Sequence, residues 1–314
     1  MQTLLQPQSI LIGIAFFLPI ASPPLFGWLS GLLAVPVFFT LRATGERANI
    51  LIRNGLLLAG CGALVVRRLE MIFFVLSLVA LAYGLHRSAR RGDDPAVAGG
   101  KGVLILGGAW LLFWTTYGLA VSINPYTHLV TSLDGAFGQI DALYSQSSEI
   151  PAETVLQIRM IIEEIRAFIP RLLPGLLAAT VIMTVWLNQT LGNGLLLRYC
   201  PARAAWPPYG RWRLPERLVW LVIGGATMVL VGQGTIKDTG LWILLVSGLL
   251  YLFQGLALFV YFLEKWRMPI YLRLLLYTIL AIQSYGLLLL AVFGLADTWL
   301  DVRKLSKNTD KELP

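Results

Sequence analysis

Several long apolar runs divide this chain, and they constrain its fold more than any other feature of the sequence. A helix needs about 18 or more apolar residues to cross the hydrocarbon core of a bilayer, and several runs approach or exceed that length. Charged residues make up only 13% of the chain, whereas a soluble domain has about 25%. The sequence therefore predicts an all-α polytopic integral membrane protein, a bundle of about eight transmembrane helices (roughly seven to nine) plus one amphipathic helix.

Polar and proline-rich segments set the bounds of the predicted spans. Prolines interrupt the first region, which is therefore either two short spans that meet in a tight turn or one bent span that follows a half-inserted segment. We expect a single transmembrane bundle over residues 1–304 and a polar tail over residues 305–314. The predicted spans are Ile10–Leu41, Ile50–Val66, Leu69–Leu85, Gly102–Ser122, Leu176–Leu187, Leu218–Val231, Leu241–Leu263 and Ile270–Leu295.

Residues 131–169 are the least hydrophobic stretch and form an insert in the predicted bundle. Apolar residues recur at helical spacing over Pro151–Ile169, and charged residues occupy the remaining face. Arg159 and Glu163 are four residues apart and are expected to form a surface ion pair. We interpret this part as an amphipathic helix that lies on the membrane or caps the bundle, and that can continue past Pro170 into the next span.

A loop over residues 192–217 separates two apolar halves of the chain, and Trp206–Trp220 is its most informative part. Pro207, Pro208 and Gly210 exclude a continuous helix there. Aromatic rings favour the water–lipid boundary, and arginines need water or phosphate. We therefore interpret this stretch as the place where the chain re-enters the bilayer. The side chains expected at the interface are Trp206, Trp212 and Trp220.

The net charge of +8 comes largely from arginines at the ends of apolar runs. The positive-inside rule places basic residues there, so the expected partner is the lipid bilayer, together with a membrane protein partner if there is one, and not nucleic acid. We expect a multi-pass protein of the bacterial inner (plasma) membrane, with the loop over residues 192–217 in the cytoplasm. Three predicted spans follow this loop, which places the tail on the opposite side although its own basic residues favour the cytoplasm.

Motifs for catalysis are absent from the sequence, which has no nucleophile elbow, no Walker loop and no His-Glu-x-x-His. Cys61 and Cys200 lack the spacing of a disulfide framework or a zinc site. We therefore expect no enzymatic activity, no metal and no cofactor.

Polar side chains inside the apolar runs are the remaining candidates for function, because each is costly in lipid. They serve either as hydrogen-bond partners between helices or as walls of a ligand pocket. Gln254 and Gln283 lie deep in their runs and are expected to point into the bundle. Arg53 either snorkels to the headgroups or faces a polar cavity. The candidate ligand-binding residues are Asn188, Gln189, Gln254, Gln283 and Arg53.

A charged motif of Asp297, Asp301 and Arg303 marks the C-terminal end of the last run. The two carboxylates are four residues apart and share one helix face. We expect this helix to extend past the membrane, with both carboxylates in water. A loop arginine then pairs with them and docks the tail against the loop. The candidates for that arginine include Arg42, Arg211 and Arg213.

Four segments have a distinctive pattern, namely Arg211–Trp220, Tyr251–Ala257, Lys265–Arg267 and Gly294–Arg303. In these segments the chain resembles the YybS-like family, a group of uncharacterised bacterial multispanning membrane proteins. The resemblance covers the chain from about Ile10 to Lys304, with Val302 where the family usually has phenylalanine. Remotely, such proteins are similar in fold to the substrate-binding membrane subunits of energy-coupling-factor transporters. The resemblance implies a membrane bundle and supplies no catalytic residues.

Two functions from different classes fit this sequence. The first is a transport-type or small-ligand-binding membrane protein whose ligand is unknown. The second is a non-catalytic scaffold or assembly protein that binds partners in the cell envelope. A central cavity lined by buried amides favours the first, whereas a bundle filled with side chains and carrying an apolar groove towards lipid favours the second. An intramembrane enzyme would need acid and base groups clustered in a wet cavity.

Overall fold

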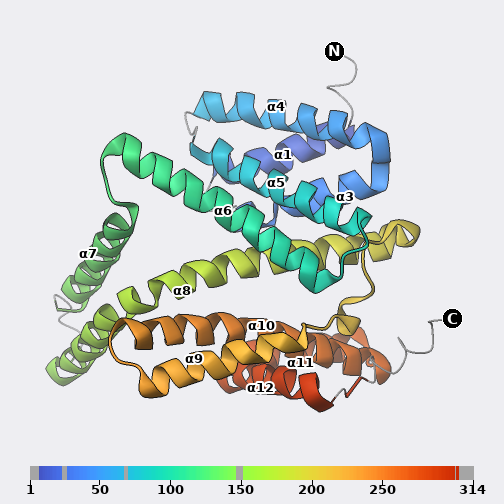
Figure 1. Ribbon diagram of the computed structural model, residues 1–314. Coiled ribbons are helices and arrows are strands. Elements are labelled where there is room, and N and C mark those ends of the chain that lie inside the picture. The colour runs from blue at the N-terminus through green and yellow to red at the C-terminus, as the bar shows by residue number, and fades with distance from the viewer. Residues whose placement is uncertain (1–6, 23–26, 67–69, 146–150, 301, 304–314) are drawn as a thin grey trace. The chain divides into compact units, whose positions relative to one another are not determined.

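The computed structural model describes residues 7–22, 27–66, 70–145, 151–300 and 302–303, and every regular element in these residues is a helix (Figure 1). The elements in chain order, with η for a short 3₁₀-helix, are α1 (Pro7–Ala21), η1 (Gly27–Leu32), α3 (Ala34–Thr44), η2 (Gly45–Arg47), α4 (Ala48–Val66), α5 (Glu70–Arg90), α6 (Pro95–Val121), α7 (Pro125–Ser145), α8 (Ala152–Tyr199), η3 (Pro201–Arg203), η4 (Tyr209–Arg211), η5 (Glu216–Leu218), α9 (Val219–Val231), α10 (Thr235–Lys265), α11 (Ile270–Ile282) and α12 (Ser284–Leu300).

Five of the described helices, α4, α5, α6, α8 and α10, are long and apolar enough to cross a bilayer. A sixth span exists if the bent pair α11 and α12 is one broken span. These helices confirm the predicted all-α architecture of a polytopic membrane protein. The total of about eight spans stays a prediction, because the count above rests on length and composition.

Helix α8 is longer than the sequence predicts. It runs without interruption from Ala152 to Tyr199 and contains Pro170 and Pro174. At 1.5 Å per residue, its 48 residues have a contour length of about 70 Å, more than twice the hydrocarbon thickness. The predicted amphipathic helix thus continues into the following span. The predicted loop start at Gly192 is wrong, because helical hydrogen bonds continue to the end of α8 and the loop begins at Cys200.

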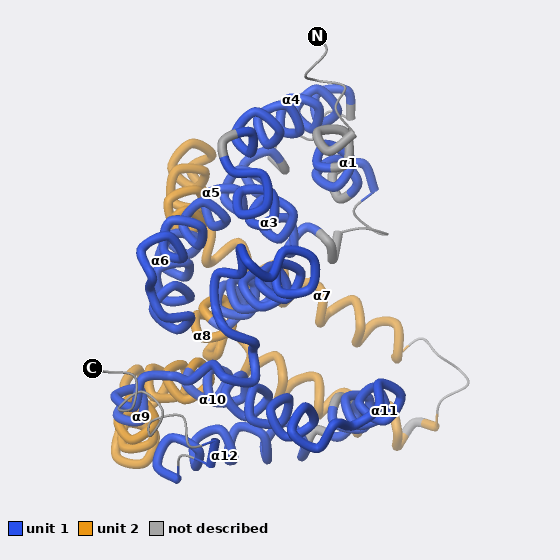
Figure 2. The backbone as a smooth tube through the Cα atoms, turned by 90° about the vertical axis from the view of Figure 1, so that its right-hand side faces the viewer, with its two compact units in different colours: residues 1–108, 179–220, 247–314 blue, residues 109–178, 221–246 orange. Residues whose placement is uncertain are grey.

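The chain forms two compact units, which Figure 2 distinguishes by colour. Unit 1 comprises residues 1–108, 179–220 and 247–314, and unit 2 comprises residues 109–178 and 221–246. In unit 2, α7 pairs with the first part of α8 through two exposed ion pairs, Arg166 with Asp134 and Arg159 with Asp141. Arg159 was expected to pair with Glu163, but the carboxylate on the neighbouring helix lies within reach and takes that place.

In unit 1, α1 packs along α4, and α3 packs against α5. Small residues permit the close approach of α1 and α4: a Cβ added at Gly62 would lie 2.4 Å from the ring of Phe17. The side chains of Phe16, Phe38 and Leu81 are completely buried at these contacts. The first apolar region contains two separate short helices, α1 and α3, and their role as spans stays a prediction.

The last predicted span, Ile270–Leu295, is broken in the structure. Gln283 has an extended backbone, and α11 and α12 meet there at an angle of 103°. Helix α12 then lies against α10 at two glycines: a Cβ added at Gly255 would lie 1.8 Å from the carbonyl oxygen of Leu290, and one at Gly294 would lie 2.0 Å from that of Tyr251. Only glycine permits this backbone-to-backbone contact.

The α10–α12 contact predicts a large difference between two glycine-to-alanine variants of the same helix. Gly255→Ala inserts a methyl group into the Leu290 carbonyl, so we expect the thermal unfolding temperature of the purified protein to fall by an amount equivalent to about 1–3 kcal/mol or more. Gly248→Ala is the matched control on α10, because its added Cβ meets no atom within 4 Å. Equal unfolding temperatures for the two variants would contradict this packing.

Candidate functional site

The loop between α8 and α9 is fixed to unit 1 by buried hydrogen bonds. The side-chain oxygen of Asn193 accepts hydrogen bonds from the backbone amides of Ala205 (3.1 Å) and Trp206 (3.0 Å), and its amide nitrogen donates to the carbonyl of Trp206 (3.0 Å). The Trp206 ring stacks on Phe38, and its Nε1 donates to the carbonyl of Asp93 (2.9 Å). A buried amide on the last part of α8 thus fixes the path of the loop.

Two of the three predicted interfacial tryptophans are buried in protein. Trp206 and Trp212 have exposed fractions of 5% and 9%, and Nε1 of Trp212 donates to the carbonyl of Pro207 (2.8 Å). Their predicted role at the headgroups is therefore wrong, because protein groups supply what an interface would offer: Phe38 packs on Trp206, and the carbonyls of Asp93 and Pro207 accept the two indole hydrogen bonds. Trp220, at the start of α9, is 72% exposed, and its interfacial role stays a prediction.

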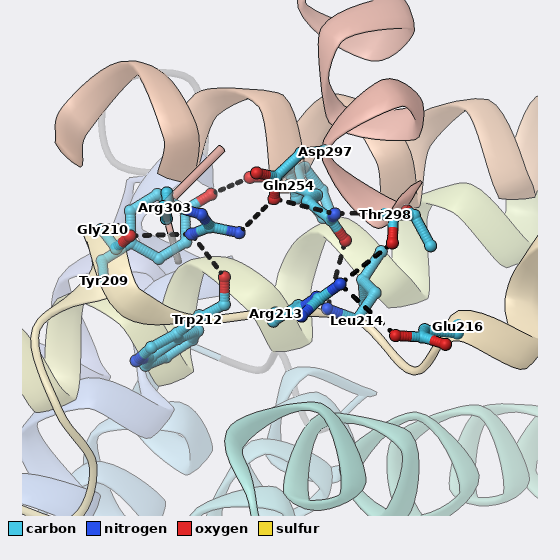
Figure 3. Close-up of polar contacts among 11 residues, drawn as sticks. Tyr209, Gly210, Trp212, Arg213, Leu214, Glu216, Gln254, Asp297, Thr298 and Arg303 are labelled. Atoms are coloured by element: carbon cyan, nitrogen blue, oxygen red, sulfur yellow. Dashed lines mark hydrogen bonds and ion pairs between the residues drawn. The ribbon is translucent and has the colours of Figure 1, made fainter. Parts of the chain in front are cut away.

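Arg303 forms the centre of the polar network that Figure 3 shows. Its guanidinium is completely buried and donates to the carbonyls of Gly210 (2.7 Å) and Trp212 (2.8 Å) and to Oδ2 of Asp297 (2.7 Å). Asp297 is only 2% exposed. One buried cation thus joins the end of α12 to the backbone of the loop, and one carboxylate neutralises it.

Gln254 of α10 connects this ion pair to the next part of the loop. Its Oε1 accepts a hydrogen bond from the backbone amide of Leu214 (3.1 Å), and its Nε2 donates to Oδ2 of Asp297 (3.3 Å) and to the hydroxyl of Thr298 (3.4 Å) (Figure 3). Arg213 donates to the carbonyl of Thr298 (2.9 Å). Two helices and the loop therefore share one hydrogen-bond network.

This network corrects the expectations about the exposure of Asp297, about its partner and about the side of the membrane on which the tail lies. Asp297 is buried and does not lie in water, because Arg303 from the same end of the chain and not a loop arginine pairs with it. The expected docking against the loop does occur, through the donors of Arg303 and Arg213. Asp301 lies outside the described residues. The end of α12 lies beside the loop, although a count of three spans predicted the opposite side of the membrane.

An apolar cavity of about 350 Å³ lies in unit 1 next to this network. Its walls come from the first turns of α6, from α8 and α10, and from the loop before α9. Aromatic rings form one side, where Trp186 stacks on Phe253 with ring centroids 4.1 Å apart and Tyr209 meets Trp186 edge-on. The polar side chains among the lining residues are Gln189, Tyr209, Arg213 and Gln254.

Tyr209 stays protonated in this setting. Burial raises the pKa of its hydroxyl well above the usual range, and the hydroxyl donates a hydrogen bond of 2.5 Å to the carbonyl of Phe253. This bond attaches the loop to the middle of α10 at the edge of the cavity. Tyr209 is therefore a fixed wall of the cavity and supplies no negative charge.

The five candidate ligand-binding residues lie in different environments in the structure. Gln189 and Gln254 are buried and line the cavity. Asn188 is buried but lies outside the lining, and its Nδ2 donates to the carbonyls of Gly31 (2.5 Å) and Thr184 (2.7 Å). Arg53 is exposed on α4, and Gln283 is exposed at the break between α11 and α12, contrary to its expected position inside the bundle.

Trp186 and Arg213 are among the lining residues that were not expected from the sequence. Trp186 precedes Gln189 by three residues, and that spacing places both on one face of α8. The sequence therefore carried a signal for Trp186. Arg213 was expected as a loop cation and as a candidate partner for the C-terminal carboxylates, and its position in the cavity wall depends on the path of the loop.

Removing the charge of Asp297 is predicted to destabilise the protein strongly. Asp297→Asn leaves the buried guanidinium of Arg303 without a counter-charge, which costs about 3–5 kcal/mol for a buried pair. Asp141→Asn is the matched control, because it removes the same charge from an exposed pair with Arg159, where the cost is under about 1 kcal/mol. Thermal unfolding of both purified variants measures the difference. If Asp297→Asn is no more harmful than Asp141→Asn, the buried pair does not stabilise the fold.

The network also predicts where the end of α12 lies relative to the membrane. Ala202→Cys and Val302→Cys, each in a background with Cys61→Ser and Cys200→Ser, should react with an impermeant maleimide from the same side of sealed membrane vesicles. The reason is that hydrogen bonds hold the end of α12 against the loop that contains Ala202. Labelling of the two positions from opposite sides would contradict this arrangement.

Comparisons with known proteins agree with the membrane character of the fold. Neither a search of curated proteins nor a search of solved structures gave a match. One family model matches residues 10–298, which is most of the chain. The protein thus belongs to the family described as Predicted membrane protein (DUF2232).

Proposed function

We propose that this integral membrane protein binds a small, mainly apolar molecule in the cavity of unit 1, as part of a transport-type function. The observation that carries the proposal is the cavity itself, which has a volume of about 350 Å³ and an aromatic and aliphatic lining. Pockets for small ligands are typically concave and mostly apolar, with a few placed polar groups. A scaffold with a side-chain-filled interior would need no such cavity.

The lining indicates the chemical class of the ligand. The amides of Gln189 and Gln254 are engaged with the protein, since Gln189 donates to the carbonyl of Pro95 (2.8 Å) and Gln254 bonds the loop. Arg213 is the one cationic side chain among the described lining residues, and it also pairs with Glu216 (3.4 Å) at the exposed side of the loop. The stacked pair of Trp186 and Phe253 offers flat apolar contacts. A flat, apolar molecule with one anionic group, such as an aromatic carboxylate, fits these features.

The family membership supports a membrane protein and assigns no ligand. We also propose that the protein is similar to the YybS-like family and, more remotely, to the substrate-binding subunits of energy-coupling-factor transporters, as the sequence indicates. We also propose the bacterial inner membrane as the location, on the basis of basic residues at the helix ends. The cavity supports a ligand-binding protein more directly than a scaffold for envelope partners.

Filling the cavity should abolish binding while leaving the fold intact. Gly100 lines the cavity from α6, and a Cβ added there meets no atom within 4 Å. Gly100→Phe therefore adds a ring at the cavity wall, and its Cβ meets no other atom. Titration with 2-naphthoate, followed by tryptophan fluorescence of the protein in nanodiscs, should show saturable binding for the wild type and binding at least about tenfold weaker for the variant.

The matched control is Gly108→Phe, on the same helix. Gly108 also has open space around an added Cβ but lies outside the cavity lining. It should bind 2-naphthoate with wild-type affinity. Equal affinities for Gly100→Phe and the wild type would contradict a ligand site in this cavity, whereas weakening by both variants would indicate a general effect on α6.

A further inference from the structure

A cluster of arginines lies where three apolar helices of the chain end. Helix α3 ends at Thr44, α5 at Arg90 and α8 at Tyr199, and the short helix η3 follows directly after α8. Arg42 comes from the last turn of α3, Arg90 from the last turn of α5, and Arg203 from η3. We refer to Arg42, Arg90 and Arg203 as the arginine cluster.

Two members of the arginine cluster hold each other in place through backbone carbonyls. Arg42 donates from Nε to the carbonyl of Arg203 (3.1 Å) and from Nη2 to that of Ala204 (3.2 Å). Arg203 donates from Nη1 to the carbonyls of Arg42 (3.4 Å) and Ala43. These reciprocal bonds satisfy carbonyls at the end of α3 and bring two guanidinium groups together. Nη1 of Arg42 and Nε and Nη2 of Arg203 take no part in them.

The cluster has an excess of positive charge. Arg90 and Arg203 both lie close enough to Arg42 to repel its charge, and Arg42 and Arg90 act in the same way on His86 of α5. Among the described side chains, none of the three arginines forms an ion pair with a carboxylate. Nδ1 of His86 is buried and has no hydrogen-bond partner in the described part of the chain. Arg42 is half-buried, whereas Arg90 and Arg203 are exposed, and like charges at this distance repel one another unless an anion lies between them.

The position of the cluster indicates which anion it meets. Helix α5 and the long helix α8 are candidate membrane spans, and we infer that one boundary of the hydrocarbon lies near their adjacent ends. Phosphate groups of lipids lie at that level, and guanidinium groups bind phosphate with paired hydrogen bonds. We propose that the arginine cluster is a binding site for a phosphate group, carried either by an anionic lipid headgroup or by a free phosphate.

Arg90→Gln tests the proposal with little risk to the fold, because the side chain of Arg90 is exposed and the carbonyl contacts belong to Arg42 and Arg203. Arg87→Gln is the matched control: Arg87 is also exposed and in the last turn of α5, but it is not among the charges that act on Arg42. Each basic residue near a lipid surface contributes about 1 kcal/mol to anion attraction, which corresponds to about fivefold in affinity. Arg90→Gln should therefore weaken binding about fivefold, and Arg87→Gln should weaken it less.

Two measurements on the full chain distinguish the sources of the phosphate. Native mass spectrometry counts the phosphatidylglycerol molecules that stay bound to the protein after its release from nanodiscs of phosphatidylglycerol and phosphatidylcholine. The shift of the thermal unfolding temperature in maltoside micelles reports the binding of inorganic phosphate. If the wild type retains phosphatidylglycerol but shows no shift with inorganic phosphate, and Arg90→Gln retains less of the lipid, the site binds a headgroup. If inorganic phosphate raises the unfolding temperature of the wild type and raises that of Arg90→Gln less, the site binds free phosphate.

Two outcomes would overturn the proposal. One is that neither probe binds the wild type. The other is that Arg90→Gln and Arg87→Gln weaken binding equally, because diffuse basic charge would then explain the effect. Arg203→Gln provides a second check when its unfolding temperature in the absence of anion is close to that of the wild type. It should then lose phosphate or lipid binding at least as strongly as Arg90→Gln.

Discussion

The buried guanidinium of Arg303 is the interaction on which the described loop and the last helix both depend. A charge removed from solvent is costly. It is tolerated here because Asp297 neutralises it and two loop carbonyls accept hydrogen bonds from it. Those carbonyls, of Gly210 and Trp212, belong to a segment whose prolines exclude regular hydrogen bonding. Arg303 therefore satisfies backbone groups that no helix or sheet could satisfy.

The same network gives the cavity its shape. Gln254 uses both ends of its amide, one on Leu214 of the loop and the other on Asp297 and Thr298 of α12. The loop is thereby held against α10 and forms a wall instead of filling the space between α6, α8 and α10. Because these polar groups bond one another, the interior left beside them is apolar. The ligand class proposed above follows from this mainly apolar lining.

Close backbone contact is a second constraint, and it acts together with the ion pair. Gly255 and Gly294 let α12 lie directly on α10, which brings Asp297 within reach of Gln254. A larger residue at either glycine would separate the helices by more than the hydrogen bonds of Gln254 can span. Packing and electrostatics at this end of unit 1 are therefore coupled, and neither is sufficient alone.

Hydropathy and helix breakers in the sequence determined the all-α membrane class, most helix positions and the irregular loop around Pro207 and Pro208. These features depend on local physics: apolar runs favour helices in lipid, and proline lacks a backbone donor. Gln254 and Gln283 show that these local features do not predict which polar side chains are buried. Each is a glutamine within an apolar run, yet Gln254 is buried in the network and Gln283 is exposed at a bend.

Only the tertiary structure decided which carboxylate and which arginine would pair. Asp297 is equally compatible, in sequence, with any arginine of the loop. The crossing of α12 on α10 turns Asp297 inward, and the chain after α12 bends back so that Arg303 and not a loop arginine reaches it. Arg303 and Asp297 are only six residues apart, but the other contacts of this pair, with Gly210, Trp212 and Gln254, join residues distant in sequence and depend on how the helices and the loop pack. A local pattern contains no such information.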